Sequence, residues 1–122
     1  ELLKMKSRIQ LPVYNDGVAK IYRICEDDDI QATKYLKYTG MCVCYCELSI
    51  SDKLRSSIEA NGIDITSKIR LPYMKKLIDS NCVLKIDGGY QKVYNVFHYK
   101  DSNGFKHSDI TLTNWEDHYE ER

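Results

Sequence analysis

This sequence of 122 residues has no apolar run near the roughly 20 residues that a membrane-spanning helix needs. It also has no net charge, because 18 basic residues balance 18 acidic ones, and this argues against a strong general attraction to nucleic acid or to an anionic membrane. No charged start, apolar stretch and small-residue cleavage site form a signal peptide. We therefore expect a soluble protein without a membrane partner, made in a cytoplasm.

The sequence also lacks residues with the spacing of a known catalytic or metal-binding motif. The three histidines are His98, His107 and His118, and none has the spacing of a metal site or a nucleophile pair. His98 and His107 can face each other across the last hairpin, as a polar cross-strand pair or, less favoured, as a pair of metal ligands. The acidic run 26–29 lacks the alternating ligands and the central glycine of an EF-hand loop. The sequence predicts no enzyme and no catalytic, cofactor-binding or metal site.

Five cysteines are present, and an odd number argues against a complete disulfide framework. Cys42, Cys44 and Cys46 have a spacing that suggests zinc, but their neighbours are typical of a strand. On a strand the outer two would lie about 13 Å apart, too far to share one tetrahedral ion. We therefore expect a reduced cysteine ridge that packs into the core as small apolar side chains.

Most of the chain alternates apolar and polar residues between turn residues, as in antiparallel hairpins. A short helix of about ten residues is expected from Ser51 or Asp52 to the stop at Asn61-Gly62. The segment 30–40 has no clear period and is the expected long loop, and 73–81 is a second loop. Strands are predicted at residues 5–13, 18–25, 41–50 (central), 63–71, 82–86, 90–100 and 105–115. These elements predict a mainly β single domain over residues 1–122: a small antiparallel β-barrel of six to seven strands with one short helix and long loops.

Ten tyrosines stand against two phenylalanines and one tryptophan, and a domain of this size cannot bury them all. Exposed tyrosine suits protein interfaces, and it also suits single-stranded nucleic acid, whose bases stack on aromatic side chains of β-barrels. Tyrosines at the edges of a core remain an equal alternative. Charge is uneven along the chain: residues 51–100 carry nine basic and five acidic side chains, and residues 101–122 carry two and six. Such patches favour head-to-tail contact between copies, although monomers also have them.

The order of several stretches is informative. The chain opens with KSRIQLPV at residues 6–13, turns at NDG (15–17), and continues after the helix with ITSKIRL (65–71). It closes with VLKIDGGYQKVYNV (83–96) and DITLT (109–113). This order resembles the head-tail joining proteins of tailed bacteriophages, also called head closure or stopper proteins. The tail-completion and tail-adaptor proteins of the same neck region are similar as well.

The resemblance implies a structural protein of the virion that is synthesised in the bacterial host cytoplasm and placed at the head-tail interface. There it would form a ring of copies that closes the DNA-filled head and offers a surface to the tail. The implied partners are the portal, connector or adaptor protein of the head, the tail or tail-terminator protein, and further copies of the chain. Packaged DNA would be a contained, non-specific neighbour. A single-stranded nucleic-acid-binding β-barrel is the alternative from another class.

Two loops are candidates for contact with the DNA channel and with the neighbouring proteins. A loop that projects into the channel would contain the acidic run, whose carboxylates would repel phosphate and keep DNA from adhering to the wall. The alternative is a solvated loop without contacts. The candidate residues of this channel or gating loop are Glu26, Asp27, Asp28, Asp29, Tyr35, Lys37 and Tyr38. The second loop is the candidate for contact with portal or tail, through Tyr73, Lys75 and Lys76.

Overall fold

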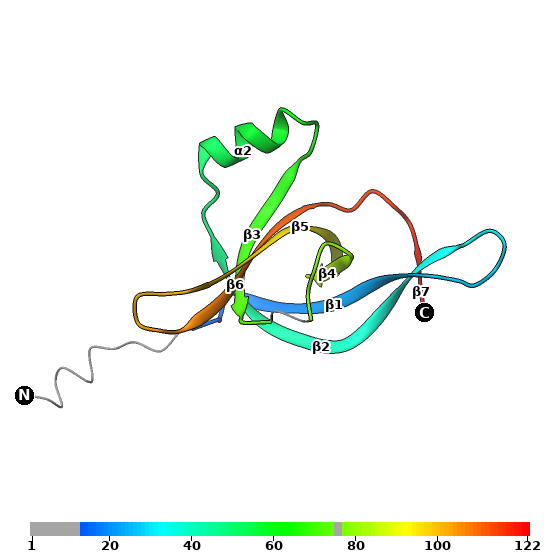
Figure 1. Ribbon diagram of the computed structural model, residues 1–122, viewed down its shortest axis with the longest axis horizontal. Coiled ribbons are helices and arrows are strands. Elements are labelled where there is room, and N and C mark those ends of the chain that lie inside the picture. The colour runs from blue at the N-terminus through cyan, green and yellow to red at the C-terminus, as the bar shows by residue number, and fades with distance from the viewer. Residues whose placement is uncertain (1–12, 75–76) are drawn as a thin grey trace, which may run out of the picture.

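The computed structural model describes residues 13–74 and 77–122, and these fold into one sheet of seven strands with one helix beside it (Figure 1). The elements are β1 (Gly17–Glu26), β2 (Lys34–Leu48), α2 (Asp52–Glu59), β3 (Ile65–Pro72), β4 (Cys82–Ile86), β5 (Gly89–Lys100), β6 (Lys106–Asn114) and β7 (Glu120–Glu121).

The sheet closes on itself. Its strands follow the order β1-β4-β5-β6-β3-β2, and β1 pairs again with β2, so that the six strands form an uneven ring. All neighbours in this ring are antiparallel. β2 and β3 pair only over residues 46–48, which is the weakest side of the ring. The predicted mainly β, barrel-like fold is confirmed, and β2 is central as expected because strands pair with both of its edges.

Local turn chemistry explains the hairpins and the helix. Asp87 and Gly88 have φ angles of 53° and 81°, the left-handed pair that a two-residue type I′ turn requires between β4 and β5. The helix α2 begins at its cap Ser51, whose Oγ accepts a hydrogen bond from the Leu54 N–H at 3.2 Å. It is followed by Gly62 at φ 77°. Both the β4–β5 turn and the short helix were predicted and are confirmed.

The main core lies inside the ring and takes alternate residues from its strands. Its largest fully buried side chains include Ile21 on β1, Leu84 on β4 and Ile110 on β6. Met74 and Ile78, from the segment between β3 and β4, join the same cluster. This segment is therefore more than a surface loop, because two of its side chains fill the inside of the ring.

The predicted loop at 30–40 is wrong over most of its length, because β2 already begins at Lys34 and only residues 27–33 form the turn after β1. The physical reason is that this part of the β1–β2 hairpin extends beyond the ring. Both faces of residues 37–40 are exposed, so no core imposes an alternating pattern on the sequence there. The first predicted strand, residues 5–13, lies almost wholly outside the described residues.

The predicted burial of the cysteine ridge is also wrong. Cys42 and Cys44 are exposed and Cys46 is half-buried, whereas Tyr45 is buried and Met41 packs against the core. Successive residues of a strand point to opposite faces, so the core takes one set and the cysteines face outward. Both sets are apolar, which is why the sequence pattern did not distinguish them.

Candidate functional site

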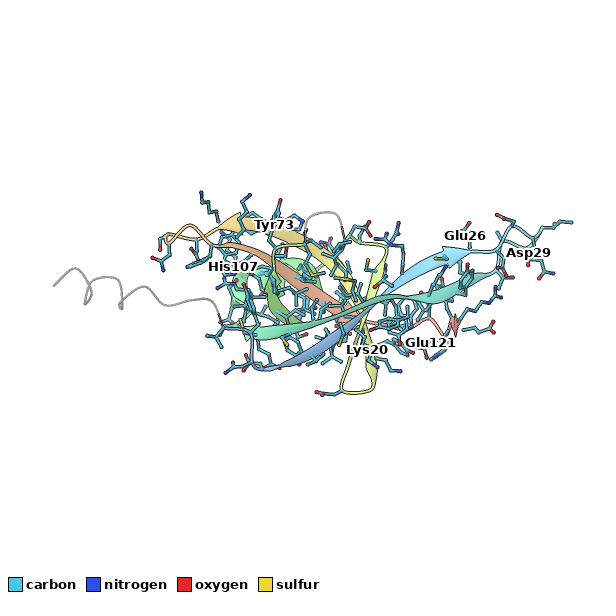
Figure 2. The ribbon with its side chains drawn as sticks, turned by 90° about the horizontal axis from the view of Figure 1, so that it is seen from below. Lys20, Glu26, Asp29, Tyr73, His107 and Glu121 are labelled. Atoms are coloured by element: carbon cyan, nitrogen blue, oxygen red, sulfur yellow. The ribbon has the colours of Figure 1, made fainter. Side chains whose placement is uncertain are left out.

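The most prominent surface feature is the far half of the β1–β2 hairpin, which we call the arm: residues 22–26 of β1, the turn 27–33 and residues 34–38 of β2. Figure 1 shows it extending beyond the ring, and Figure 2 shows Glu26 and Asp29 at its far end. Regular pairing continues to Glu26 and Lys34, whose side chains also approach to 4.0 Å. The arm is therefore a paired ribbon that carries an acidic tip, not the irregular loop expected.

Hydrogen bonds define the conformation of the tip. The Asp27 N–H donates to the Thr33 carbonyl at 2.9 Å, and the Ala32 N–H donates to the Asp29 carbonyl at 3.1 Å. The Asp29 carboxylate also accepts from the Thr33 N–H at 3.3 Å. Ile30 is fully exposed at the end of this turn, next to the exposed side chains of Asp28 and Asp29. The tip thus presents two carboxylates and one large apolar side chain to solvent.

The other candidate residues of this loop lie on β2 and do not meet at one point. Tyr35 is half-buried near the tip, Lys37 is exposed, and Tyr38 lies nearer the ring. The Tyr38 ring packs against Tyr22 with centroids 5.2 Å apart, and the Lys20 ammonium lies 6.0 Å from the Tyr38 centroid. The structure therefore groups the acidic residues at the tip and places Tyr38 in an aromatic cluster at the base of the arm.

A segment that the sequence did not reveal lies along one edge of the arm. Residues 119–122, which include β7, run parallel to β2, with Glu120 opposite Tyr35 and Glu121 opposite Leu36. The Arg122 N–H donates to the Leu36 carbonyl at 2.8 Å, and its guanidinium reaches the Asp27 carboxylate at 2.6 Å. We call this piece the 119–122 segment. No hydrophobic period predicts it, since only two of its residues form a strand.

Glu121 is the polar centre of this contact. The neighbouring Tyr90 and Tyr22 hydroxyls stabilise its carboxylate form and so hold the pKa of Glu121 below its usual value. The neighbouring Glu121 carboxylate and burial raise the pKa of the Tyr22 hydroxyl to about 12. Burial and the same carboxylate raise the pKa of Tyr90. Lys85 completes the surroundings at 3.9 Å from the carboxylate. The group is stable as a carboxylate between two neutral phenols.

Beneath this polar centre lies a second, smaller apolar cluster. It contains the buried side chains of Tyr22, Leu36 and Val83, and Trp115 and Tyr119 pack against it. The Trp115 and Tyr119 rings meet edge to face at 5.2 Å. The 119–122 segment and the residues before it therefore cover an apolar patch on the outer face of the sheet.

The second candidate surface lies toward the other end of the molecule, where Figure 2 places Tyr73 and His107. Lys75 and Lys76 lie outside the described residues. Tyr73 is 39% exposed, and its ring meets His98 edge to face at 5.3 Å and has the Lys106 ammonium 5.2 Å from its centroid. It borders an open hollow of about 380 Å³. The other residues that line this hollow are His98, Tyr99, Lys100 and Lys106. This end thus combines aromatic and basic side chains.

The two histidines of the last hairpin do not pair with each other. His98 lies opposite Ser108 and His107 opposite Tyr99, so the two rings point to different faces of the sheet. The His98 Nδ1 accepts from the Ser108 hydroxyl at 2.7 Å, and that hydroxyl accepts from the Met74 N–H at 3.0 Å. Ser108 is fully buried, so its oxygen is not open to a substrate from solvent.

His107 is buried with both ring nitrogens bonded. Its Nε2 donates to the Asp101 carboxylate at 2.7 Å, and its Nδ1 accepts from the Tyr14 hydroxyl at 2.7 Å, which is the tautomer that this network requires. The hydrogen bond from His107 lowers the pKa of Asp101. This Tyr-His-Asp chain ties the residues that precede β1 to β6 and to the β5–β6 turn. The sequence missed it because Tyr14 lies 93 residues from His107 along the chain.

Metal binding finds no support in the described ranges, where no group of three or more His, Cys, Asp or Glu side chains is placed to hold an ion. In the same residues no helix is long and apolar enough to cross a membrane. A scan against models of known protein families finds no match. A search among curated proteins finds none either.

Proposed function

We propose that this chain is a structural protein of the phage neck, which forms a ring between the portal and the tail and closes the DNA-filled head. The observation that supports this best is the acidic arm on a small barrel-like body. The order of sequence stretches that resembles head closure proteins supports it independently. In this role the arm reaches the channel, and the body contacts neighbouring copies, the head and the tail.

The charges of the arm suit a wall that must contain DNA without holding it. Asp28 and Asp29 are exposed at the tip, where they would repel phosphate. Asp27 instead serves the structure, since it binds Arg122. The exposed Ile30 beside these carboxylates offers an apolar contact with the arms of other copies at the centre of a ring. The tip can therefore close a channel by apolar contact while its charges keep DNA from adhering.

The opposite end suits a protein contact. Tyr73 and Tyr99 line its hollow with Lys100 and Lys106. Tyrosine is enriched at the centres of interfaces, and polar side chains form their rims. Acidic surfaces of the head or of the tail are the expected partners there. A tail-completion or tail-adaptor protein would use the same two ends, but the end that contacts the head in a head closure protein would contact the tail.

A reconstitution experiment tests the proposed function. DNA-filled heads isolated without this protein are incubated with the purified chain, and the DNA that survives nuclease treatment is measured per head. We expect the chain to bind the heads and to raise the protected fraction. Equal protection with and without the chain would contradict head closure. Binding to isolated tails but not to heads would instead support the tail-completion alternative.

One observation favours a second candidate, a single-stranded nucleic-acid-binding barrel. On the outer face of β1 and β4, Lys20 approaches the Tyr38 ring and Lys85 lies 5.2 Å from the Tyr90 centroid. Cations beside aromatic rings are the elements with which barrels bind single strands. This candidate predicts salt-sensitive binding of a labelled oligonucleotide, weakened by Lys20→Gln with Lys85→Gln. The neck assignment predicts no such binding at physiological salt.

A further inference from the structure

The 119–122 segment contacts the arm as an added edge strand. β2 offers an open edge there, because β1 occupies only its other edge at Tyr35 and Leu36. The segment adds a short parallel strand to this edge, and the Arg122 N–H closes it on the Leu36 carbonyl at 2.8 Å. Main-chain bonds of this kind supply affinity in strand addition, and side-chain pockets supply specificity.

Two side chains of the segment have matched partners. Arg122 lies over the Tyr35 ring, 4.4 Å from its centroid, and pairs with Asp27 at 2.6 Å. The Glu121 carboxylate lies 3.9 Å from the Lys85 ammonium. A glutamate followed by an arginine thus meets a cation and then a carboxylate. The site selects this order of charges, since the reverse order would place like charges together.

The connection to the rest of the chain allows the segment to leave. Between the end of β6 at Asn114 and the start of β7 at Glu120, the chain forms no regular structure, and residues 116–118 are exposed. The receiving site includes the arm, which extends beyond the ring (Figure 1). An element held by a short exposed connection can exchange between identical copies at little cost, because each contact is made again.

We propose that the 119–122 segment docks on the arm of a second copy of this chain, in place of its own, when copies assemble. Each copy then gives one segment and receives one. In the assembly this contact runs from the body of one copy to the arm of the next, so it repeats around a ring. This role in a ring rests on the proposed function, but exchange between free copies does not.

Two variants of the full chain separate the two halves of the contact. The first variant has an altered receiving site through Asp27→Arg and Lys85→Glu. The second has an altered segment through Glu121→Lys and Arg122→Asp. In either variant alone, like charges oppose docking within and between copies. In a mixture, the intact segment of the first variant meets the intact site of the second, and the two altered halves also have matching charges.

We expect each variant alone to sediment as a monomer and the equimolar mixture to form a complex of about twice the mass. The mixture should be studied up to about 1 mM, the effective concentration that a short connection supplies within one chain. If the 119–122 segment docks on the arm within its own chain, the intact segment of the first variant must also bind the intact site of the second variant at that concentration. A mixture that sediments as two separate monomers overturns the proposal.

A chain with all four changes is the matched control, because its altered segment and site again match within one molecule. It should be folded and monomeric when dilute. If a variant with altered charges fails to fold, a peptide of residues 115–122 titrated into the Arg122→Asp chain gives a second measurement. NMR shifts on β2 and at Tyr22 support exchange, and unchanged spectra up to the same concentration overturn it. Neither result depends on DNA retention, so a failed head-closure assay is distinguished from failed exchange.

Discussion

Trimming the tip of the arm should leave the protein stable and abolish its proposed role in DNA retention. The change replaces residues 28–32 by Asn-Gly. Asp27 and Thr33 already form a hydrogen-bonded pair, with 2.9 Å between the Asp27 nitrogen and the Thr33 oxygen, which is the position that flanks a two-residue turn. Asp27 remains, so its ion pair with Arg122 is kept. Trimming further, to residue 38, would instead remove part of β2.

The energetic terms of this change are small and of opposite sign. Two exposed hydrogen bonds to Asp29 are lost, at about 0.5–1.5 kcal/mol each. The left-handed conformation of Ala32, at φ 50°, is removed, which returns about 1 kcal/mol. Closing a loop of about half the length returns roughly 0.6 kcal/mol more. We expect the free energy of unfolding to change by about 1 kcal/mol or less, which corresponds to roughly 4 °C in Tm.

The assay compares the trimmed chain with the wild type in nuclease protection of filled heads, after thermal unfolding has been measured by circular dichroism. We expect an almost unchanged Tm and a clear loss of protected DNA. The variant Asp28→Asn with Asp29→Asn is the control, because it keeps the length of the arm and removes only charge. Full protection by the trimmed chain would refute the gating role of the arm. A Tm fall of more than about 10 °C would refute the energetic reasoning instead.

Two further predictions concern the sheet itself. Cys42 and Cys44 are exposed and should react with iodoacetamide in the native protein. Cys82, whose thiol pKa is raised by burial, should react only after unfolding. Equal labelling of all three cysteines in peptide mass spectra would contradict the orientation of β2. Arg70→Gln should lower the free energy of unfolding by about 3 kcal/mol, because it leaves the Asp109 carboxylate, whose side chain is 9% exposed, without its partner. Asp109→Asn should lower it by only about 1–2 kcal/mol, because the Arg70 side chain that loses its partner is 31% exposed. Urea unfolding measures both, and the reverse order would be inconsistent with this pair.

Local features of this fold were predictable from sequence. The turn at Asp87 and Gly88 follows from two adjacent residues that tolerate positive φ, between two alternating runs. The helix between Ser51 and Gly62 follows from its cap and its stop. Such features depend on neighbours along the chain, so the pattern of residues contains enough information to predict them.

Features that depend on distant residues were not predictable. Gly40, at φ 83°, lies where three residues of β2 stand opposite Ile21, and a sequence does not reveal such an irregularity of register. The pairing of Arg122 with Asp27 spans most of the chain. The arm was taken for a loop because Leu36 alone is buried among residues 34–38, which leaves no alternating pattern in the sequence there. These same features, the arm and its cover, make up the candidate site.

Electron microscopy of particles produced after deletion of the gene for this chain tests the neck assignment most directly. The account predicts heads that have lost their DNA, beside complete tails that are not attached to them. Restoring the gene in trans should restore joined, filled particles. Normal joined virions in the absence of the chain would contradict the account and would leave the nucleic-acid-binding candidate as the next to test.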